Sequence, residues 1–240
     1  MTTSEASPLD HDPKLAPIRA AAGTRPLVVA QLGQTLDGRI ATVTGESRWI
    51  NRDAALDHLH GLRASVDAVL VGVGTAIADD PLLNVRRVAG RHPARVVLDP
   101  AGRLPPTARL LSPEDGARRI VVRDVACDSP VPEGVEVVRI ARGNGQLPPC
   151  AVVQALFELG LARLLIEGGA VTVSGFIDAG AVDRLHVLVA PMLMGSGKTG
   201  LELSPIACLA DALRPSTRVH VLADGDVLFD CDMRSRNLTT

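Results

Sequence analysis

Short runs of almost uninterrupted apolar residues most constrain how this 240-residue chain can fold. Residues 27–32 and 67–72 show no regular alternation of apolar and polar side chains. Strands of this kind are covered on both faces, as in parallel sheets flanked by helices. Between them, residues 52–63 carry apolar side chains at helical spacing, with Asn51 suited to cap the helix. The sequence therefore predicts an α/β fold with a mostly parallel central sheet flanked by helices.

The same patterns continue along the chain. Helical spacing recurs over residues 150–159 and 171–179. Residues 223–226 (Ala-Asp-Gly-Asp) separate the last two apolar runs and predict an antiparallel C-terminal hairpin at the sheet edge. We expect at most nine short strands, over residues 27–32, 67–72, 94–98, 119–122, 135–140, 163–166, 185–190, 218–222 and 227–229.

Composition argues against several classes of function. The formal net charge is −2 and the arginines are scattered, so we expect no binding to nucleic acid or to a membrane. One Trp, three Phe and no Tyr are too few for a base-stacking surface. The four cysteines lack the spacing of metal ligands, so no metal site is expected. No apolar run reaches the roughly 20 residues of a membrane-spanning helix, and a cytoplasmic protein is expected.

The N-terminal residues differ from the rest of the chain. Residues 1–25 contain several prolines and aspartates and lack the apolar segment of a signal peptide, so we expect a mobile leader there. Residues 26–240 are expected to form one domain.

Three loops after predicted strands contain most of the residues capable of chemistry, namely residues 37–49, 72–86 and 167–175. Parallel strands end at one edge of a sheet, so we expect these loops to converge on one crevice. Gly168 and Gly169 precede a predicted helix and are suited to phosphate binding. Gly72 and Gly74 begin like a dinucleotide-binding motif, but Ile77 replaces its third glycine, and a tight turn is the favoured interpretation.

Several polar residues have two interpretations. Arg63 and Arg86 are candidate phosphate ligands, although surface ion pairs are the commoner role of isolated arginines. Glu167, at a strand end, is equally suited to cap the next helix and to bind a substrate. His58 and His60 are two residues apart on one predicted helix, so they point to different sides and are not expected to form a metal pair.

Residues 194–199 (Met-Gly-Ser-Gly-Lys-Thr) end like a nucleotide-binding P-loop. The first glycine of that signature would be residue 192, which is Met, and Pro205 follows where a long helix is required. We therefore expect no P-loop here.

A series of short motifs stands in a characteristic order along the chain. They are Thr35-Leu-Asp-Gly-Arg-Ile-Ala41, Gly45-Glu-Ser-Arg-Trp-Ile50, Leu62-Arg63, Asp79-Asp-Pro-Leu-Leu-Asn-Val-Arg86, Ile166-Glu-Gly-Gly169, Val182-Asp-Arg-Leu185 and Ala190-Pro-Met-Leu-Met-Gly195. Together they resemble the reductase domain of the bifunctional riboflavin-biosynthesis deaminase/reductase. The resemblance covers about residues 26–230, and the ordered set is far more specific than any one motif.

The resemblance implies a dihydrofolate-reductase-like fold, usually dimeric, for a reductase domain over residues 26–240. It implies that NADPH reduces the ribose of 5-amino-6-(5-phosphoribosylamino)uracil to a ribityl chain. The substrate contacts that it implies are Ser47, Arg63, Leu83, Arg86 and Glu167. The cofactor contacts that it implies are Gly33, Trp49, Thr75, Asp79, Gly169, Ala170, Val171, Thr172, Val173, Ser174 and Gly175. Asp37 and Glu167 are the candidates for assisting protonation.

The chain departs from this family pattern in three places. It has no His-Ala-Glu and no Pro-Cys-x-x-Cys zinc signature, so deamination requires another protein. Gln31 stands where the family usually has a lysine, which leaves the substrate less narrowly defined. Pro100 stands where the family often has a serine near the cofactor's 2′-phosphate. Arg103 is a candidate replacement, and NADPH is expected over NADH.

Two other functions stay open at this point. One is the reduction of a related pterin-like or other heterocyclic metabolite. The other is nucleotide binding without catalysis.

Overall fold

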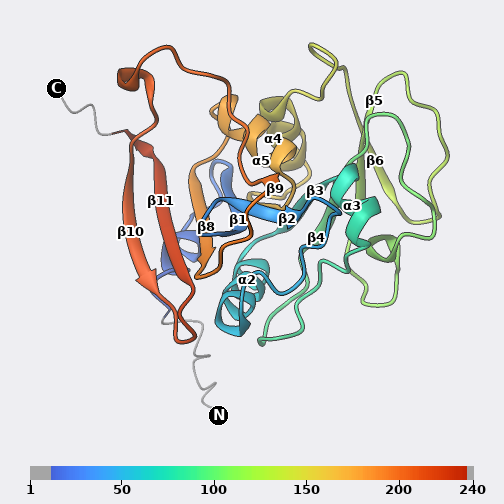
Figure 1. Cartoon of the computed structure of the whole chain (residues 1–240). Helices are drawn as coiled ribbons and strands as arrows, with labels where there is room; N and C mark the ends of the chain where they lie inside the picture. Colours follow the sequence, from blue (N-terminus) through green and yellow to red (C-terminus); the bar gives the residue numbers. More distant parts are fainter. Residues whose placement is uncertain (1–11, 237–240) are drawn as a thin grey trace.

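The computed structural model describes residues 12–236, and within them the predicted apolar runs form one large sheet (Figure 1). Its strands are β1 (Leu27–Thr35), β3 (Ala68–Gly72), β4 (Ala94–Leu98), β5 (Arg119–Asp124), β6 (Glu136–Ile140), β7 (Arg163–Glu167), β8 (Arg184–Ala190), β10 (Pro215–Val221) and β11 (Val227–Arg236). They lie in the order β10-β11-β8-β1-β7-β3-β4-β5-β6.

Every neighbouring pair from β8 to β6 is parallel, whereas β11 is antiparallel to both β8 and β10. The turn of the hairpin contains Gly225, whose φ of 95° suits glycine. The predicted mostly parallel sheet with an antiparallel C-terminal hairpin is therefore confirmed.

Helices cover both faces of the parallel part of the sheet, which explains why its strands are apolar throughout. The helices are α2 (Asp53–Ser65), α3 (Val73–Asp79), α4 (Pro149–Glu158) and α5 (Ala170–Asp178). In β1, Val28 and Ala30 pack towards α4 and α5, whereas Leu27 and Val29 belong to the apolar cluster on the α2 and α3 side. No helix within residues 12–236 is both long and apolar enough to cross a membrane.

Part of the expected N-terminal leader is packed into the domain. Residues 1–11 lie outside the described part of the chain, but residues 12–25 include the short helix α1 (Ala16–Arg19). Leu15 and Ile18 are completely buried among the apolar residues on the α2 side. The ordered domain thus begins well before residue 26, because two leader residues complete its core.

The N-terminus of α2 is capped from the far end of the chain. Asn51 does not cap the helix, and its side chain donates instead to Oδ2 of Asp226, at 3.1 Å. Asp226 also accepts the backbone N–H of Arg52 at 2.9 Å, and Asp224 accepts that of Ala54 at 2.8 Å. The predicted cap is wrong because these two carboxylates of the hairpin turn take its place.

The prediction of at most nine strands is also wrong, because a separate two-stranded sheet exists. In it, β2 (Arg39–Thr42) pairs with β9 (Gly197–Thr199) in antiparallel fashion. These strands are short and contain glycine, lysine and threonine, so no apolar run marks them. The rejection of a P-loop over residues 194–199 agrees with the extended structure of β9.

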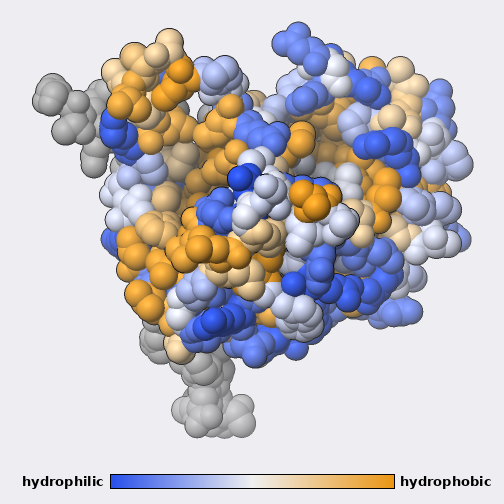
Figure 2. Space-filling view, viewed as in Figure 1, coloured by the Kyte–Doolittle hydropathy of each residue, from blue (hydrophilic) through white to orange (hydrophobic). Residues whose placement is uncertain are grey.

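In the described part of the chain, one face of the hairpin of β10 and β11 is largely exposed, with Val219, Val221 and Phe229 at 57%, 75% and 37%. On the opposite face, Leu188 and Leu228 pack against Ala55 of α2. This side, called the open face below, is formed by residues of three strands that are in register: Val187, Val189, Thr217, Val219, Val221, Val227, Phe229 and Cys231. Val187 and Cys231 lie where the open face meets the apolar core. Figure 2 shows apolar side chains gathered over β10 and β11 at the left of the molecule.

Candidate active site

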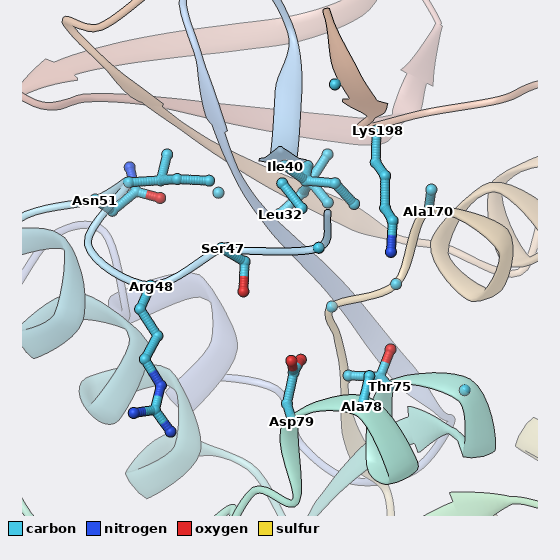
Figure 3. A pocket seen from close by; sticks show the side chains of 18 of the residues that line it. Leu32, Ile40, Ser47, Arg48, Asn51, Thr75, Ala78, Asp79, Ala170 and Lys198 are labelled. Atoms are coloured by element: carbon cyan, nitrogen blue, oxygen red, sulfur yellow. The ribbon is translucent and has the colours of Figure 1, made fainter. Parts of the chain in front are cut away.

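The carboxyl ends of β1, β3 and β7 border a cleft with a volume of about 1030 Å³. Because these strands are parallel neighbours, the loops that follow them leave the sheet at the same edge. The three predicted loops line the cleft through Ser47, Trp49, Thr75, Asp79, Gly168 and Gly169. Figure 3 shows Ser47, Thr75 and Asp79 facing this space. The predicted convergence of the loops is confirmed.

The turn before α5 requires glycine. Gly168 and Gly169 have positive φ angles of 64° and 73°. A Cβ atom on Gly169 would lie 2.6 Å from Oγ1 of Thr75, which is too close. Since α5 begins at Ala170, its first N–H groups and the positive end of its dipole face the same space. This glycine cradle, formed by Gly168, Gly169, Ala170 and Thr75, fits a phosphate or pyrophosphate group.

A second cavity, of about 440 Å³, meets the main cleft at the glycine cradle. The two cavities share Gly74, Thr75, Gly169, Ala170 and Val171. Beyond the cradle, the second cavity is lined by Gly72, Leu98, Pro100, Arg103, Leu147, Thr172, Gly175 and Phe176, among others. The two cavities thus meet at the glycine cradle, where the pyrophosphate of a dinucleotide that occupied both would lie.

The expected cofactor segment from Gly169 to Gly175 is only partly directed at these cavities. Val173 is completely buried in the apolar core. Ser174 is also buried, and its hydroxyl accepts the backbone N–H of Glu202 at 2.8 Å. The side chains of these two residues lie on the inner face of α5, away from the cavities, and their contact with a ligand stays a prediction. The other five residues of the segment line one or both cavities.

A smaller cavity of about 290 Å³ lies beside the main cleft and is rich in arginine. This arginine pocket contains the side chains of Arg48, Arg63, Arg86 and Arg109. Partial burial, and then the nearby charge of Arg63, lower the pKa of Arg86. A bound phosphate would relieve the mutual repulsion of these guanidinium groups, because each can donate in a fork to its oxygens.

Two further expected residues also border the arginine pocket. Asp79 lies in both the main cleft and the arginine pocket. Leu83 lines the pocket with its side chain almost fully buried, and its φ of 53° is unusual for a residue other than glycine. The pocket therefore adjoins the main cleft along the loop that follows α3.

Arg63 and Glu167 form a buried ion pair beneath the arginine pocket. Nε of Arg63 donates to Oε2 of Glu167 at 2.9 Å, and a second guanidinium nitrogen donates to Oε1. Arg63 also donates to the carbonyl oxygen of Asn84 at 3.0 Å. Removing one partner of such a pair typically costs about 3–5 kcal/mol. Glu167 is thus neither a helix cap nor a free acid, and it fixes the position of Arg63.

His60 and Asn84 position Arg86, and neither was singled out from the sequence for this role. Nδ1 of His60 accepts the backbone N–H of Arg86 at 3.1 Å, and Oδ1 of Asn84 accepts from its guanidinium group at 3.0 Å. Burial, followed by the charges of Arg63 and Arg86, lowers the pKa of His60 to about 3. His60 is therefore neutral near pH 7 and free to accept this hydrogen bond.

Asp37 has a structural role outside the cleft lining. Its carboxylate accepts hydrogen bonds from the Thr35 hydroxyl and from the backbone N–H groups of Met194 and Gly195. These bonds, that of Thr35 first, lower the pKa of Asp37 from 3.8 to about 2. Asp37 therefore stays ionised near pH 7 and fastens the loop after β8 to the loop after β1, and its assistance to protonation stays a prediction.

The remaining expected residues, Gly33, Ser47 and Trp49, all line the main cleft. Trp49 is 78% exposed and has a φ of 70°, so its ring is displayed at the cleft rather than packed in the core. Arg48 and Arg109 were missed. Arg48 lies within a recognised motif. Arg109 lies in no recognised motif, and its backbone N–H donates to Asp80, which also lines the pocket, at 2.8 Å.

No group of side chains within the described part of the chain could hold a metal ion. His58 and His60 do point to different sides of α2, as predicted. His58 stacks on His186, with 3.0 Å between Nε2 of His58 and Nδ1 of His186.

Residues 26–217 match the RibD C-terminal domain family. The chain belongs to this family. A 2,5-diamino-6-ribosylamino-4(3H)-pyrimidinone 5′-phosphate reductase of Methanothermobacter thermautotrophicus is 36% identical over 200 residues, covering 79% of this chain and 90% of the relative. The riboflavin biosynthesis protein RibD of Aquifex aeolicus is 36% identical over 209 residues, covering 85% of this chain and 57% of the relative.

The fold of this RibD C-terminal domain is also that of a solved structure. A deaminase/5-amino-6-(5-phosphoribosylamino)uracil reductase from Thermotoga maritima superimposes with a TM-score of 0.73 and 30% identity, covering 90% of this chain and 58% of the other. The chain thus spans little more than half of the Aquifex and Thermotoga proteins. The predicted resemblance and its fold class are confirmed.

Replacing Asp37 with Asn tests its structural role in the RibD domain. The folded protein depresses the pKa of Asp37, so its stabilising effect is complete above the unfolded value of about 4 and disappears as pH falls through about 2. We expect Asp37→Asn to be less stable than wild type at pH 7, with the difference shrinking between about pH 4 and pH 2. Urea denaturation across this pH range measures it, and a constant difference would contradict the assignment.

Proposed function

We propose that this chain is an NAD(P)H-dependent reductase of a phosphoribosylamino-pyrimidine in riboflavin biosynthesis, with 5-amino-6-(5-phosphoribosylamino)uracil as its substrate. One observation carries the proposal: a single cleft joins the glycine cradle to the arginine pocket. The cradle suits the pyrophosphate of a dinucleotide, and the arginine pocket suits a sugar phosphate. The names of the Methanothermobacter and Thermotoga relatives support the same class of reaction.

In this reaction a ribosylamine becomes a ribitylamine. The sugar ring opens to an imine, which takes up a hydride at carbon and a proton at nitrogen. A bound nicotinamide would supply the hydride. The chain's own residues hold the reacting carbon in place and exclude other orientations. The displayed ring of Trp49 and the hydroxyl of Ser47 lie where they can border the substrate and the nicotinamide.

For the substrate phosphate, we assign the clamp chiefly to Arg86, with Arg48 and Arg109 beside it. Arg63 donates hydrogen bonds to Glu167, so its contribution to the phosphate site is chiefly its positive charge and the support it gives to the pocket wall. Leu83 closes the pocket from the loop side.

The function is tested by mixing the purified protein with NADPH and the phosphoribosylaminouracil. Oxidation of NADPH with formation of the ribityl product is expected. The 2,5-diamino-pyrimidinone phosphate is the comparison substrate, because a relative is named for it. If neither pyrimidine is reduced with either nicotinamide, the proposal fails.

Arg86→Ala tests the phosphate clamp. Losing a charged hydrogen bond of about 1.5–3 kcal/mol predicts a roughly 10- to 100-fold increase in substrate KM, with little change in cofactor affinity. Arg87→Ala is the matched control, because Arg87 pairs with Asp53 and Asp57 and does not border the pocket. Equal losses of substrate and cofactor affinity in Arg86→Ala would contradict the assignment.

We propose NADPH as the preferred cofactor, with Arg103 as the contact of its 2′-phosphate. Arg103 lines the second cavity, on the far side of the glycine cradle from the main cleft. Asp99, the nearest carboxylate in sequence, is completely buried and accepts the N–H groups of Arg103 and Leu104, at 2.8 and 3.0 Å. Asp99 does not line the cavity, and the guanidinium group of Arg123, 3.9 Å from its carboxylate, offsets its charge.

Arg103→Ala is expected to lower the preference for NADPH over NADH by about tenfold, corresponding to about 1.4 kcal/mol. The ratio of kcat/KM for the two cofactors measures this. Arg139→Ala should leave the ratio unchanged, because Arg139 lies on an exposed strand that does not line the cavity. The assignment is lost if Arg103→Ala affects NADH as strongly as NADPH.

We also propose that the chain forms a homodimer through the open face. Val219 and Val221 are 57% and 75% exposed there, and Phe229 lies between them and β8. A groove of about 550 Å³ runs along this face. An apolar surface of this kind is stabilised when a second copy covers it.

Val219→Asp should convert the dimer to monomers, because each copy would bury an unpaired charge at the interface. Sedimentation velocity measures the change. Val125→Asp is the control, since Val125 is equally exposed, at 54%, but lies after β5 and away from the open face. A wild-type protein that sediments as a monomer at all concentrations would rule out the dimer.

A further inference from the structure

Lys198 of β9 brings a positive charge into the main cleft, and the function described above gives it no role. Among the 25 basic residues of the chain, Lys14 and Lys198 are the two lysines. Lys14 forms an ion pair with Asp12, at 2.8 Å. Lys198 instead lines the cleft, and Figure 3 shows its side chain extending into the cavity on the side of Ala170.

The position of Lys198 is fixed by the small sheet that the sequence did not reveal. Lys198 is in register with Ala41 of β2. A Cβ atom on Gly197 would overlap the carbonyl oxygen of Ala41, and one on Gly200 would lie 2.7 Å from Oε1 of Gln34. Glycine on both sides of the Lys198-Thr199 pair therefore lets this strand lie close against β2 and the end of β1. The backbone from which the Lys198 side chain enters the cleft is therefore fixed in position.

The ammonium group has no ion-pair partner within residues 12–236. The nearest acidic residue along the chain that lines the cleft is Glu202, whose carboxylate accepts the hydroxyl of Thr199 at 2.5 Å. Nζ of Lys198 instead faces the Gly45 turn, where a Cβ atom would lie 3.5 Å away. Lys198 is therefore a free cation directed into the cavity.

The charges of the cleft are divided between two ends. Arg48 and Arg86 belong to the end that includes the arginine pocket. At the other end, the start of α5 offers only about half an elementary charge. A pyrophosphate group there carries two negative charges, so the cradle alone leaves most of that charge unbalanced. Lys198 is the cation that lines the cleft away from the arginines.

We propose that Lys198 binds the pyrophosphate of the nicotinamide cofactor from the β9 side of the cleft, beside the glycine cradle. This inference rests on the proposed function, because it requires a nicotinamide dinucleotide in the two cavities. Lys198 acts as a point charge on the phosphate oxygens, whereas the cradle donates from backbone N–H groups. It makes the β2 and β9 sheet a part of the cofactor site.

The test compares the dissociation constants of NADPH and NADH for wild type, Lys198→Ala and Lys198→Arg. Trp49 is the one tryptophan of a chain without tyrosine, and it lines the same cleft, so its fluorescence reports binding. We expect Lys198→Ala to weaken both cofactors by the same factor, about tenfold, because both contain the pyrophosphate. Lys198→Arg should recover most of the affinity, since it keeps the charge.

Two further probes separate the pyrophosphate from the rest of the cofactor. Calorimetry with 2′-AMP, which has the 2′-phosphate and no pyrophosphate, should give the same affinity for wild type and Lys198→Ala. Reductive methylation followed by mass spectrometry should show that NADH protects Lys198. Lys14 in the same sample is the internal control, because it lies outside the cleft.

Two results would overturn the proposal. The first is an unchanged cofactor affinity in Lys198→Ala, including the case in which only kcat falls or only substrate KM rises. The second is a loss of affinity for NADPH alone, with the affinity for NADH unchanged. Failure of the proposed function gives a different result, because wild type would then reduce neither pyrimidine, whatever the effect of Lys198→Ala on cofactor affinity.

Discussion

The central strands β1, β7 and β3 are buried on both faces, and this burial determines where chemistry can occur in the molecule. Val29, Leu70 and Leu165 are completely shielded from solvent, so no ligand can reach the sheet through its faces. In β7 the polar side chains, Arg163 and Glu167, stand at the two strand ends, where the backbone turns out of the sheet. Because the three strands are parallel, their carboxyl ends bring three loops together at one edge. The cleft is thus a consequence of the way the sheet is covered.

The ion pair of Arg63 and Glu167 links that sheet edge to the arginine pocket. Glu167 is the last residue of β7, and Arg63 belongs to the last turn of α2, so the pair holds this helix against the central strands. The pair also places the buried guanidinium group of Arg63 below Arg86. The backbone N–H of Arg86 in turn donates to the neutral His60. A site of four arginines is stable without a ligand only if some of the charge is already compensated. Glu167 provides this compensation from below and leaves the upper side of the pocket positive.

The parts of the molecule that were predictable are those whose signal is local in sequence. Apolar runs such as residues 68–71 identify buried strands, and Gly168 and Gly169 before a helical segment identify the cradle. The parts that were missed depend on distant residues. Asp226 displaces Asn51 as the cap of α2 from 175 positions away, and Arg63 meets Glu167 across 104 positions. β9 contains three residues and no apolar run, so its pairing with β2 was invisible, although it directs Lys198.

The position of Asp79 influences where along the cleft negatively charged groups can bind. This carboxylate borders both the main cleft and the arginine pocket, between the two regions that attract anions. A negative charge there disfavours a phosphate group midway along the cleft, because like charges repel in a partly enclosed space. The neighbouring walls carry Leu32, Ile40 and the displayed ring of Trp49, which are suited to uncharged rings. The electrostatics thus favour two anions at opposite ends and two planar rings between them, which agrees with the proposed binding of a dinucleotide and a sugar phosphate.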